Sequence, residues 1–254
     1  MLGHAVLERD IDPFIPQFLL DRIAAHYVSS RADIVALSTV NKSCSINSRP
    51  RLWSRVSFSP AKPPSSFVAL STYTDLCEHI FEIKVSNLLP DGEYDHLLHV
   101  LDRVRNEHAH FLVVLYLCDM DLTEIPTAVL MEMVTGIGEV HLFNCSCSSV
   151  AVSNLISSAR EMHNLVLHAA KFDASVQHES VLPSSLTKCT FLPCTPADEA
   201  LALKWIPYVL FCAPIRHLTI AVYSVDALRC VSRFESTLRY LSIKVVINGT
   251  LVRP

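Results

Sequence analysis

The chain has 254 residues, of which 50% are hydrophobic and 18% charged, and this balance excludes a disordered chain, which would be charge-rich and apolar-poor. The 21 basic and 25 acidic residues give a net charge of −4, which counts against a nucleic acid partner held on a basic surface. Glycine occurs only five times, so folds that depend on glycine-rich loops are disfavoured.

The cysteines and the start of the chain bear on its compartment. There are nine cysteines, an odd number, and the chain does not open with a basic segment followed by an apolar one. We therefore expect free thiols in a reducing compartment, the cytoplasm or the nucleus. The longest apolar run, Trp205 to Ile215, is 11 residues, whereas a spanning helix needs about 20, so no membrane partner is expected.

Residues 11–58 are predicted to form a compact helical module. Pro13 and Pro16 precede the first helix, where a missing backbone N–H is tolerated, and Asp33 can cap the second. Apolar residues recur at helical spacing at Phe18, Leu19, Ile23 and Tyr27, and again at Ile34, Leu37 and Val40. Helices this short cannot bury a large core alone, so some apolar faces are expected to meet another protein or the rest of the chain.

Residues 59–75 are predicted to be a linker, because Pro60, Pro63 and Pro64 cannot continue a helix or a central strand. From residue 76 to residue 254 short aliphatic runs alternate with helical stretches. Helical spacing is found over 94–105, 149–162, 197–203 and 225–234.

The aliphatic runs fit one pattern, in which apolar residues stand at relative positions 1, 4, 6 and 9. The full matches begin at residues 80, 112, 137, 162, 215 and 238, with a weaker copy around Leu186 and Phe191. Strands that alternate with helices at a near-regular step predict a repetitive parallel sheet. This region resembles the leucine-rich repeat family in its irregular form, and Cys145 matches the asparagine or cysteine that this family places at the last position.

Three stretches of the amino-terminal module resemble an F-box. They are Ile15 to Ile23 (IPQFLLDRI), Leu37 to Ser43 (LSTVNKS) and Leu52 to Phe58 (LWSRVSF). Their order and spacing are similar to those of the F-box-like proteins abundant in mushroom-forming fungi. The chain departs from that pattern at Phe18, where an acidic residue is usual, and at Cys44 to Ile46, where a tryptophan is usual.

The resemblance implies an α/β protein: a helical F-box-like module, then an irregular leucine-rich-repeat solenoid with parallel strands on its concave face and helices on its convex face. It also implies a non-enzymatic receptor without a cofactor, which docks on the Skp-type adaptor of a cullin ubiquitin ligase and presents a bound protein target. The residues expected to contact the adaptor are Pro16, Leu19, Leu20, Ile23, Leu37, Val40 and Trp53.

The strand pattern predicts which side chains would meet the target. If the pattern residues point inward, alternation turns outward Glu82, Lys84, Tyr116, Glu139, His141, Phe143, Asn164, His168, His217, Thr219, Tyr240 and Lys244. Rings with a polar tip suit recognition. The residues selected as target-binding are Lys84, Tyr116, His141, Phe143, His168, His217 and Tyr240.

Two other functions stay open. The first is a protein-binding repeat module outside any ligase, whose F-box remnant no longer docks, and the two departures favour it. The second is a hydrolase with a Cys/His pair, which needs a thiol of lowered pKa in a cleft. The pairs Cys145 and Cys147, and Cys189 and Cys194, are interpreted as core or ladder thiols and not as metal ligands.

The last predicted strand runs to about residue 247, close to the end of the sequence. Repeat arrays normally end in a polar cap, and an uncovered strand edge invites association. We therefore expect either an additional covering interaction or a truncated gene product.

Overall fold

The computed structural model describes residues 22, 30–40, 42–60, 70, 72, 74–89, 93–107, 113–173, 185–209, 213–224, 228–234, 236–247 and 250–252. The chain divides into two units, residues 1–52 and residues 53–254. Each unit is described by itself below.

The described part of the first unit is helical. Helix α2 spans Arg31–Ser38, and its cap residue Ser30 accepts a hydrogen bond from the backbone N–H of Asp33, as expected for a serine at this position. Helix α3 begins at Lys42 and ends at Trp53. The inner residues Ile34, Cys44 and Ser48 are buried, whereas Val35, Val40 and Ile46 are exposed.

The second unit is built on a nine-stranded sheet, as the alternating sequence pattern predicts. Its strands follow one another in chain order, and every neighbouring pair is parallel except the last, which is antiparallel. The strands are β1 (Arg55–Phe58), β2 (Glu82–Ser86), β3 (Val114–Cys118), β4 (Glu139–Phe143), β6 (Asn164–His168), β8 (Lys188–Leu192), β9 (His217–Val222), β10 (Tyr240–Ile247) and β11 (Thr250–Val252). Two short strands, β5 (Ser146–Cys147) and β7 (Lys171–Phe172), form a second small parallel sheet.

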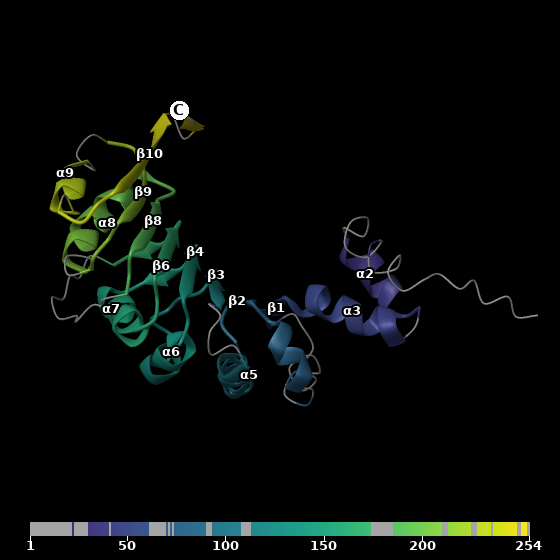
Figure 1. Cartoon of the computed structure of the whole chain (residues 1–254). Coiled ribbons are helices and arrows are strands. Elements are labelled where there is room, and N and C mark those ends of the chain that lie inside the picture. Colours follow the sequence, from purple (N-terminus) through teal and green to yellow (C-terminus); the bar gives the residue numbers. More distant parts are fainter. Residues whose placement is uncertain are drawn as a thin grey trace, which may run out of the picture. The chain divides into compact units, whose positions relative to one another are not determined.

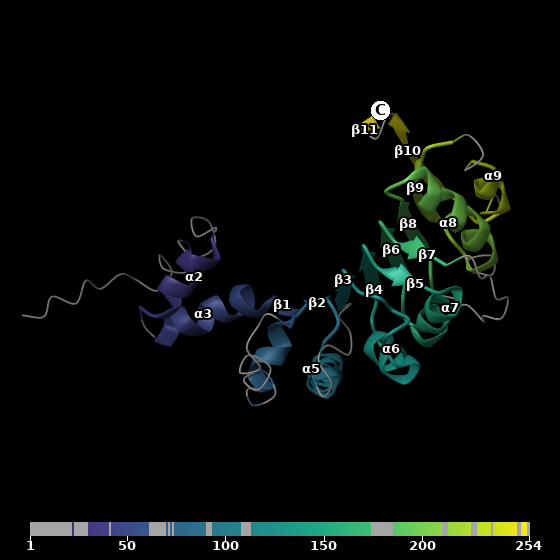
Figure 2. The same ribbon diagram turned by 180° about the vertical axis from the view of Figure 1, so that it is seen from behind.

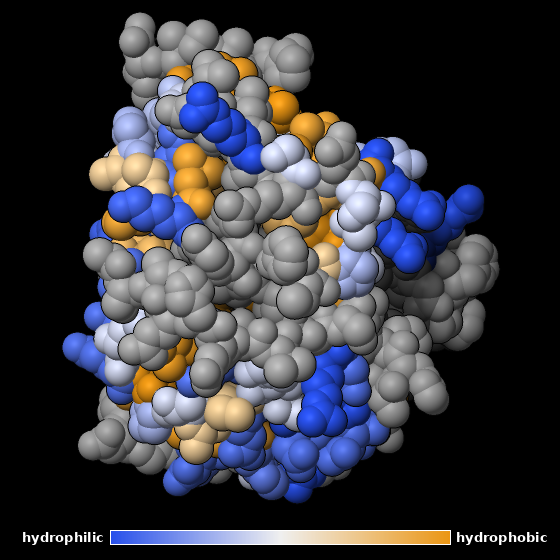
Figure 3. All heavy atoms as spheres, turned by 90° about the vertical axis from the view of Figure 1, so that its left-hand side faces the viewer, coloured by the Kyte–Doolittle hydropathy of each residue, from blue (hydrophilic) through white to orange (hydrophobic). Residues whose placement is uncertain are grey.

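Helices connect successive strands and lie on one side of the sheet (Figures 1 and 2). They are α5 (Glu93–Glu107), α6 (Thr127–Val134), α7 (Ser149–Ser158), α8 (Pro196–Val209) and α9 (Leu228–Val231), with the short 3-10 segments η1 (Thr74–His79) and η3 (Ser232–Phe234). On the side seen in Figure 3, hydrophilic and hydrophobic residues of the described chain are interspersed. A mixed α/β fold with a mostly parallel sheet is thus confirmed.

The core lies between the sheet and these helices. All seven predicted strand positions are strands, and the inward alternation is confirmed from β2 to β9. The buried inner residues are Ile83, Val85, Leu115, Leu117, Val140, Leu142, Leu165, Leu167, Cys189, Phe191, Leu218 and Ile220. On the helices Leu97, Leu101, Leu130 and Leu155 close the other side of this core.

Four strands end in the same left-handed corner. Asn87, Asp119, Asn144 and Ala169 directly follow β2, β3, β4 and β6, and their φ values lie between 50° and 61°. Each corner donates its backbone N–H to the last carbonyl of the next strand, over 2.8–2.9 Å. Asn and Asp adopt this conformation more readily than other side chains do, so three of the four corners suit their residue type.

Three findings correct the sequence analysis. Residues 55–58 do not end the helical module: they form β1, which pairs with β2 and buries Phe58 completely. The chain does not stop at β10, because β11 turns back and pairs with Val245, Val246 and Ile247. Leu241, predicted to be an inner residue, is 43% exposed, because the following strand, β11, pairs only with the far end of β10.

Candidate functional site

The face of the sheet opposite the helices carries the candidate site. Strand register aligns its side chains in rows across neighbouring strands. One row contains Ser57, Lys84, Tyr116, His141 and Val166, and the next contains Ser86, Cys118, Phe143 and His168. Residues far apart in the sequence therefore meet because their strands are neighbours in the sheet.

Rings form a continuous cluster on this face. The ring centroids of Tyr116 and His141 lie 4.5 Å apart, and those of Tyr116 and Phe143 lie 6.1 Å apart. Phe143 also contacts His141, at 5.9 Å, and His168, at 5.2 Å edge to face. These separations are within the range of favourable aromatic pairs. We call Tyr116, His141, Phe143 and His168 the ring row.

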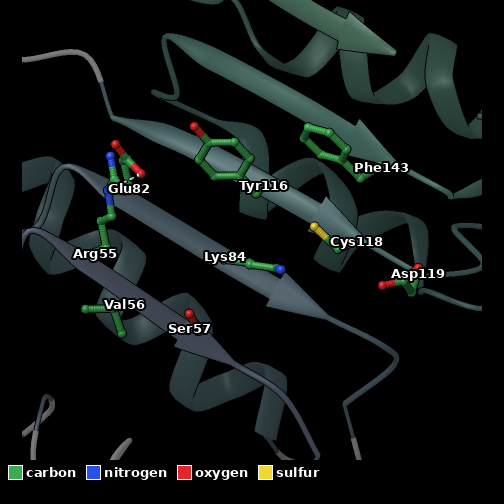
Figure 4. A pocket seen from close by; sticks show the side chains of 9 residues that line it. All are labelled: Arg55, Val56, Ser57, Glu82, Lys84, Tyr116, Cys118, Asp119 and Phe143. Atoms are coloured by element: carbon green, nitrogen blue, oxygen red, sulfur yellow. Dashed lines mark ion pairs between the residues drawn. The ribbon is translucent and has the colours of Figure 1, made fainter. Parts of the chain in front are cut away.

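A pocket of about 480 Å³ lies beside the ring row, over the first four strands (Figure 4). It is lined by Arg55, Val56, Ser57, Glu82, Lys84, Tyr116, Cys118, Asp119 and Phe143. A volume of this size suits a small molecule or a few side chains of a partner.

The acidic groups around the pocket are engaged within the chain. Glu82 forms an ion pair with Arg55, at 2.8 Å between Oε2 and Nε. Asp119 accepts a hydrogen bond of 2.8 Å from the side-chain amide of Asn144. Lys84 is exposed, and no described carboxylate lies within ion-pair distance of it.

Glu139 anchors the edge of the ring row by accepting a hydrogen bond from His141 Nε2. Burial alone would raise the pKa of this carboxyl, but hydrogen bonds from His141 and Asn164 and the charges of His141 and Lys188 outweigh it and lower the pKa. Glu139 is therefore held ionised and fixes the orientation of the imidazole beside Tyr116. For Tyr116, burial together with the charges of Glu82 and Glu139 raises the pKa, so its hydroxyl stays a neutral donor.

Of the seven residues predicted to bind a target, the structure brings five together: Lys84 and the ring row. The other two, His217 and Tyr240, stack on each other at 4.5 Å but belong to β9 and β10. Between the two groups β8 presents Lys188, Thr190 and Leu192, so the face carries two separate groups of rings.

Sequence reasoning missed Arg55 and Ser57, because residues 55–58 were assigned to the helical module. The alternation of Val56, Ser57 and Phe58 is the signal that could have identified a strand. Cys118 and Asp119 were missed as well, since they lie at the end of β3 and just beyond it.

The residues expected to contact the adaptor are only partly described. Pro16, Leu19, Leu20 and Ile23 lie outside the described residues. Leu37 is half-buried, and Val40 is 63% exposed. Trp53 is half-buried and packs against the hydrophobic core, so this indole also has a structural role.

The cysteines considered as ligands or nucleophiles are core residues, with one exception. Cys145 Sγ donates to the carbonyl of Leu117 at 3.2 Å, and Cys147 Sγ donates to the carbonyl of Cys145 at 3.7 Å. Burial raises the pKa of Cys145 to about 11 and that of Cys147 well above its usual value, which disfavours the thiolate. Cys189 is buried on β8, and Cys194 is exposed.

Two searches of the described residues complete this picture. Among them, no group of three or more His, Cys, Asp or Glu side chains could hold a metal ion. Within the same residues, no helix is both long and apolar enough to cross a membrane.

Comparison with known proteins places the chain in no family. No protein-family model matches it, and no curated protein does.

Proposed function

We propose that the chain is a non-enzymatic substrate adaptor of a Skp–cullin–F-box ubiquitin ligase. An F-box-like module in residues 11–58 docks on the Skp-type adaptor, and a leucine-rich-repeat solenoid in residues 76–254 binds a protein target. The observation that carries the proposal is the ring row on an uncovered face of a parallel sheet whose strands stack in chain order.

The repeating unit supports the assignment to leucine-rich repeats. A strand, a left-handed corner and a returning helix recur from β2 to β6, and the corners are joined by a ladder of backbone hydrogen bonds. Cys145 lies directly after one corner and bonds to the carbonyl of Leu117 in the preceding strand. A cysteine at this position of the family has the same kind of ladder role.

Exposed apolar side chains in the first unit support the docking role. Val35 and Val40 belong to the segment that begins at α2, Ile46 lies on α3, and all three are exposed. Apolar groups that a small unit leaves uncovered are typical of a surface that a partner buries. The Skp-type adaptor, and through it a cullin, is the proposed partner, with the cytoplasm or nucleus as the site of action.

The proposed mechanism requires no chemistry from this chain. A receptor that holds a target beside the ubiquitin-charged conjugating enzyme raises the effective concentration of target lysines at the transfer site. The raised pKa of the buried thiols Cys77, Cys118, Cys145 and Cys147 argues against the alternative of a thiol hydrolase that uses one of them.

Co-expression with the Skp-type adaptor tests the ligase role. We expect the wild-type chain to co-purify with the adaptor and the variants Leu19→Asp/Ile23→Asp and Val40→Asp to lose it. Val150→Asp is the matched control, because Val150 is also exposed but lies on α7 of the second unit. A wild-type chain that folds and ignores the adaptor would overturn the ligase role.

In that event the second candidate function remains: a repeat module that binds protein outside any ligase. Phe18 and the missing tryptophan at Cys44 to Ile46 favour it. The ring row would serve the same purpose in both cases.

A further inference from the structure

The charge on the pocket beside the ring row is unevenly satisfied. Each carboxylate near it has a donor within the chain: Glu82 has Arg55, Asp119 has Asn144, and Glu139 has His141. Lys84 projects into the same pocket (Figure 4), is exposed, and has no carboxylate partner among the described residues. The unmatched charge on this face is therefore a single positive one.

Apolar ring surface begins one strand away from that charge. Register places Lys84 beside Tyr116, and Tyr116 beside His141, while Phe143 lines the pocket with Lys84. Because neighbouring strands are about 4.8 Å apart, Lys84 on β2 and Phe143 on β4 are about 10 Å apart across the sheet. An extended chain advances about 3.4 Å per residue, so about three residues separate the groups that would reach both.

Resting on the proposed role of this face in target binding, we propose that it recognises an extended acidic segment of a partner protein. An Asp or Glu carboxylate pairs with Lys84, and an apolar side chain about three residues away packs on Tyr116 and Phe143. The partner is thus defined by a carboxylate and an apolar anchor at a fixed spacing.

The local charges favour a carboxylate over a phosphate group. A phosphorylated side chain carries a charge of about −1.5 to −2, and Lys84 supplies one positive charge to match it. The nearest other cation, Arg55, is already paired with Glu82. A phosphate would therefore leave negative charge unmatched beside Glu82 and Asp119, whereas a carboxylate is neutralised.

The same charges disfavour a nucleic acid strand. Binding along a phosphate backbone needs a basic groove that follows it. The row that runs from Arg55 contains Glu82 and Glu139, and these carboxylates would repel successive phosphates. A protein segment with one well-placed carboxylate avoids this repulsion.

Oriented peptide libraries test the proposal with the full-length chain immobilised. Each peptide has about ten residues, enough to cross these strands, with leucine fixed three positions after one variable site and uncharged degenerate residues elsewhere. The variable site is aspartate, phosphoserine, serine or lysine in four separate libraries. We expect the aspartate library to be retained about fivefold better than the serine library, as for one exposed ion pair, and the lysine library to be retained least.

Charge reversal at Lys84 is the decisive variant. Lys84→Glu should abolish the preference for aspartate and favour lysine, with the chain still folded because the side chain is exposed. Lys204→Glu is the matched control, since Lys204 is an exposed lysine on α8 and its reversal should leave the preference unchanged. Thermal unfolding of each variant verifies that the chain is folded.

The other outcomes separate this proposal from the proposed function. Equal retention of all four libraries, or stronger retention of phosphoserine or lysine, overturns the carboxylate proposal. If Phe143→Ala then abolishes that retention, the face still binds protein and the proposed function stands. If no library is retained, the carboxylate proposal fails, and co-purification with the Skp-type adaptor decides the ligase role independently.

Discussion

The two ends of the nine-stranded sheet bury their inner side chains differently. In β2, β3, β4 and β6 every inner residue is fully buried, for example Leu142 and Leu167. In β10 the inner residues Leu241 and Val245 are 43% and 46% exposed, although register places them beside buried Leu218 and Val222 of β9. The apolar pattern is the same at both ends, so burial depends on whether a further layer follows.

The corners differ in the same direction. After β2 to β6 the backbone itself makes the corner, through a left-handed residue and a hydrogen bond to the next strand. After β9 a side chain does this work: the buried carboxylate of Glu199 accepts the backbone N–H groups of Tyr223 and Ser224, at 2.8 and 3.4 Å. The repeat is thus regular in its first part and locally adapted in its last.

The largest expected effect contrasts inner leucines at the two ends. Leu142→Ala and Leu167→Ala each remove a fully buried side chain and should lower the free energy of unfolding by about 2–5 kcal/mol. Leu241→Ala should cost less than about 1 kcal/mol, because the side chain is already half in water. Urea denaturation measures all three, with Val166→Ala on the open face as a control that should be nearly neutral. Equal losses at Leu142 and Leu241 would contradict the contrast.

The next effect concerns Glu199. Glu199→Ala leaves two backbone N–H groups after β9 without their acceptor and should cost about 1–3 kcal/mol. Glu199→Gln keeps one carbonyl oxygen and should cost less. Glu124→Ala, at an exposed position after β3, should change stability by no more than about 0.5 kcal/mol. Similar losses for Glu199→Ala and Glu124→Ala in denaturant titrations would show that the carboxylate does not hold this corner.

The contrast between the two ends also marks what the sequence could predict. The strand positions followed from local apolar spacing, because that spacing is set within each strand. Strand β1 did not, since its partner β2 follows a proline-rich segment that hid the pairing. Helix α6 was missed because Val129, Leu130, Met131, Met133 and Val134 leave no polar stripe to reveal a helical period.

For the candidate site, alternation was enough to select side chains on the open face, but not to group them. Lys84, Tyr116 and Phe143 meet because β2, β3 and β4 are neighbours with matched register. His217 and Tyr240 satisfied the same rule yet belong to another group, since β8 presents no ring on this face between them and His168. Tertiary arrangement therefore decided which predicted residues form one site.

A smaller effect is expected at the least suited corner. Ala169 has a φ of 56°, and a left-handed conformation costs a residue with a Cβ atom about 1–2 kcal/mol. Ala169→Gly removes this strain but adds unfolded-state entropy, so a net gain of about 0.5–1 kcal/mol is expected. Ala170→Gly, at the adjacent buried position, has no such strain to relieve and should destabilise the chain by about 0.5–1 kcal/mol. Thermal unfolding distinguishes the two signs, and a loss at both positions would contradict the expectation.

The smallest effect is the pH dependence contributed by Glu139. Because its folded-state pKa is lowered, its stabilising contribution is fully present above the pKa of the unfolded chain and is lost as pH falls through the lower folded value. Stability of the wild-type chain should therefore fall more steeply below about pH 4.5 than that of Glu139→Gln, by less than about 1 kcal/mol, since the carboxyl is partly exposed and screened. Urea denaturation at a series of acidic pH values measures the difference, and Glu124→Gln should keep the wild-type slope. Parallel curves for the wild type and Glu139→Gln would mean that the bond from His141 does not stabilise the ionised carboxylate, and that the imidazole beside Tyr116 is not held in place by Glu139.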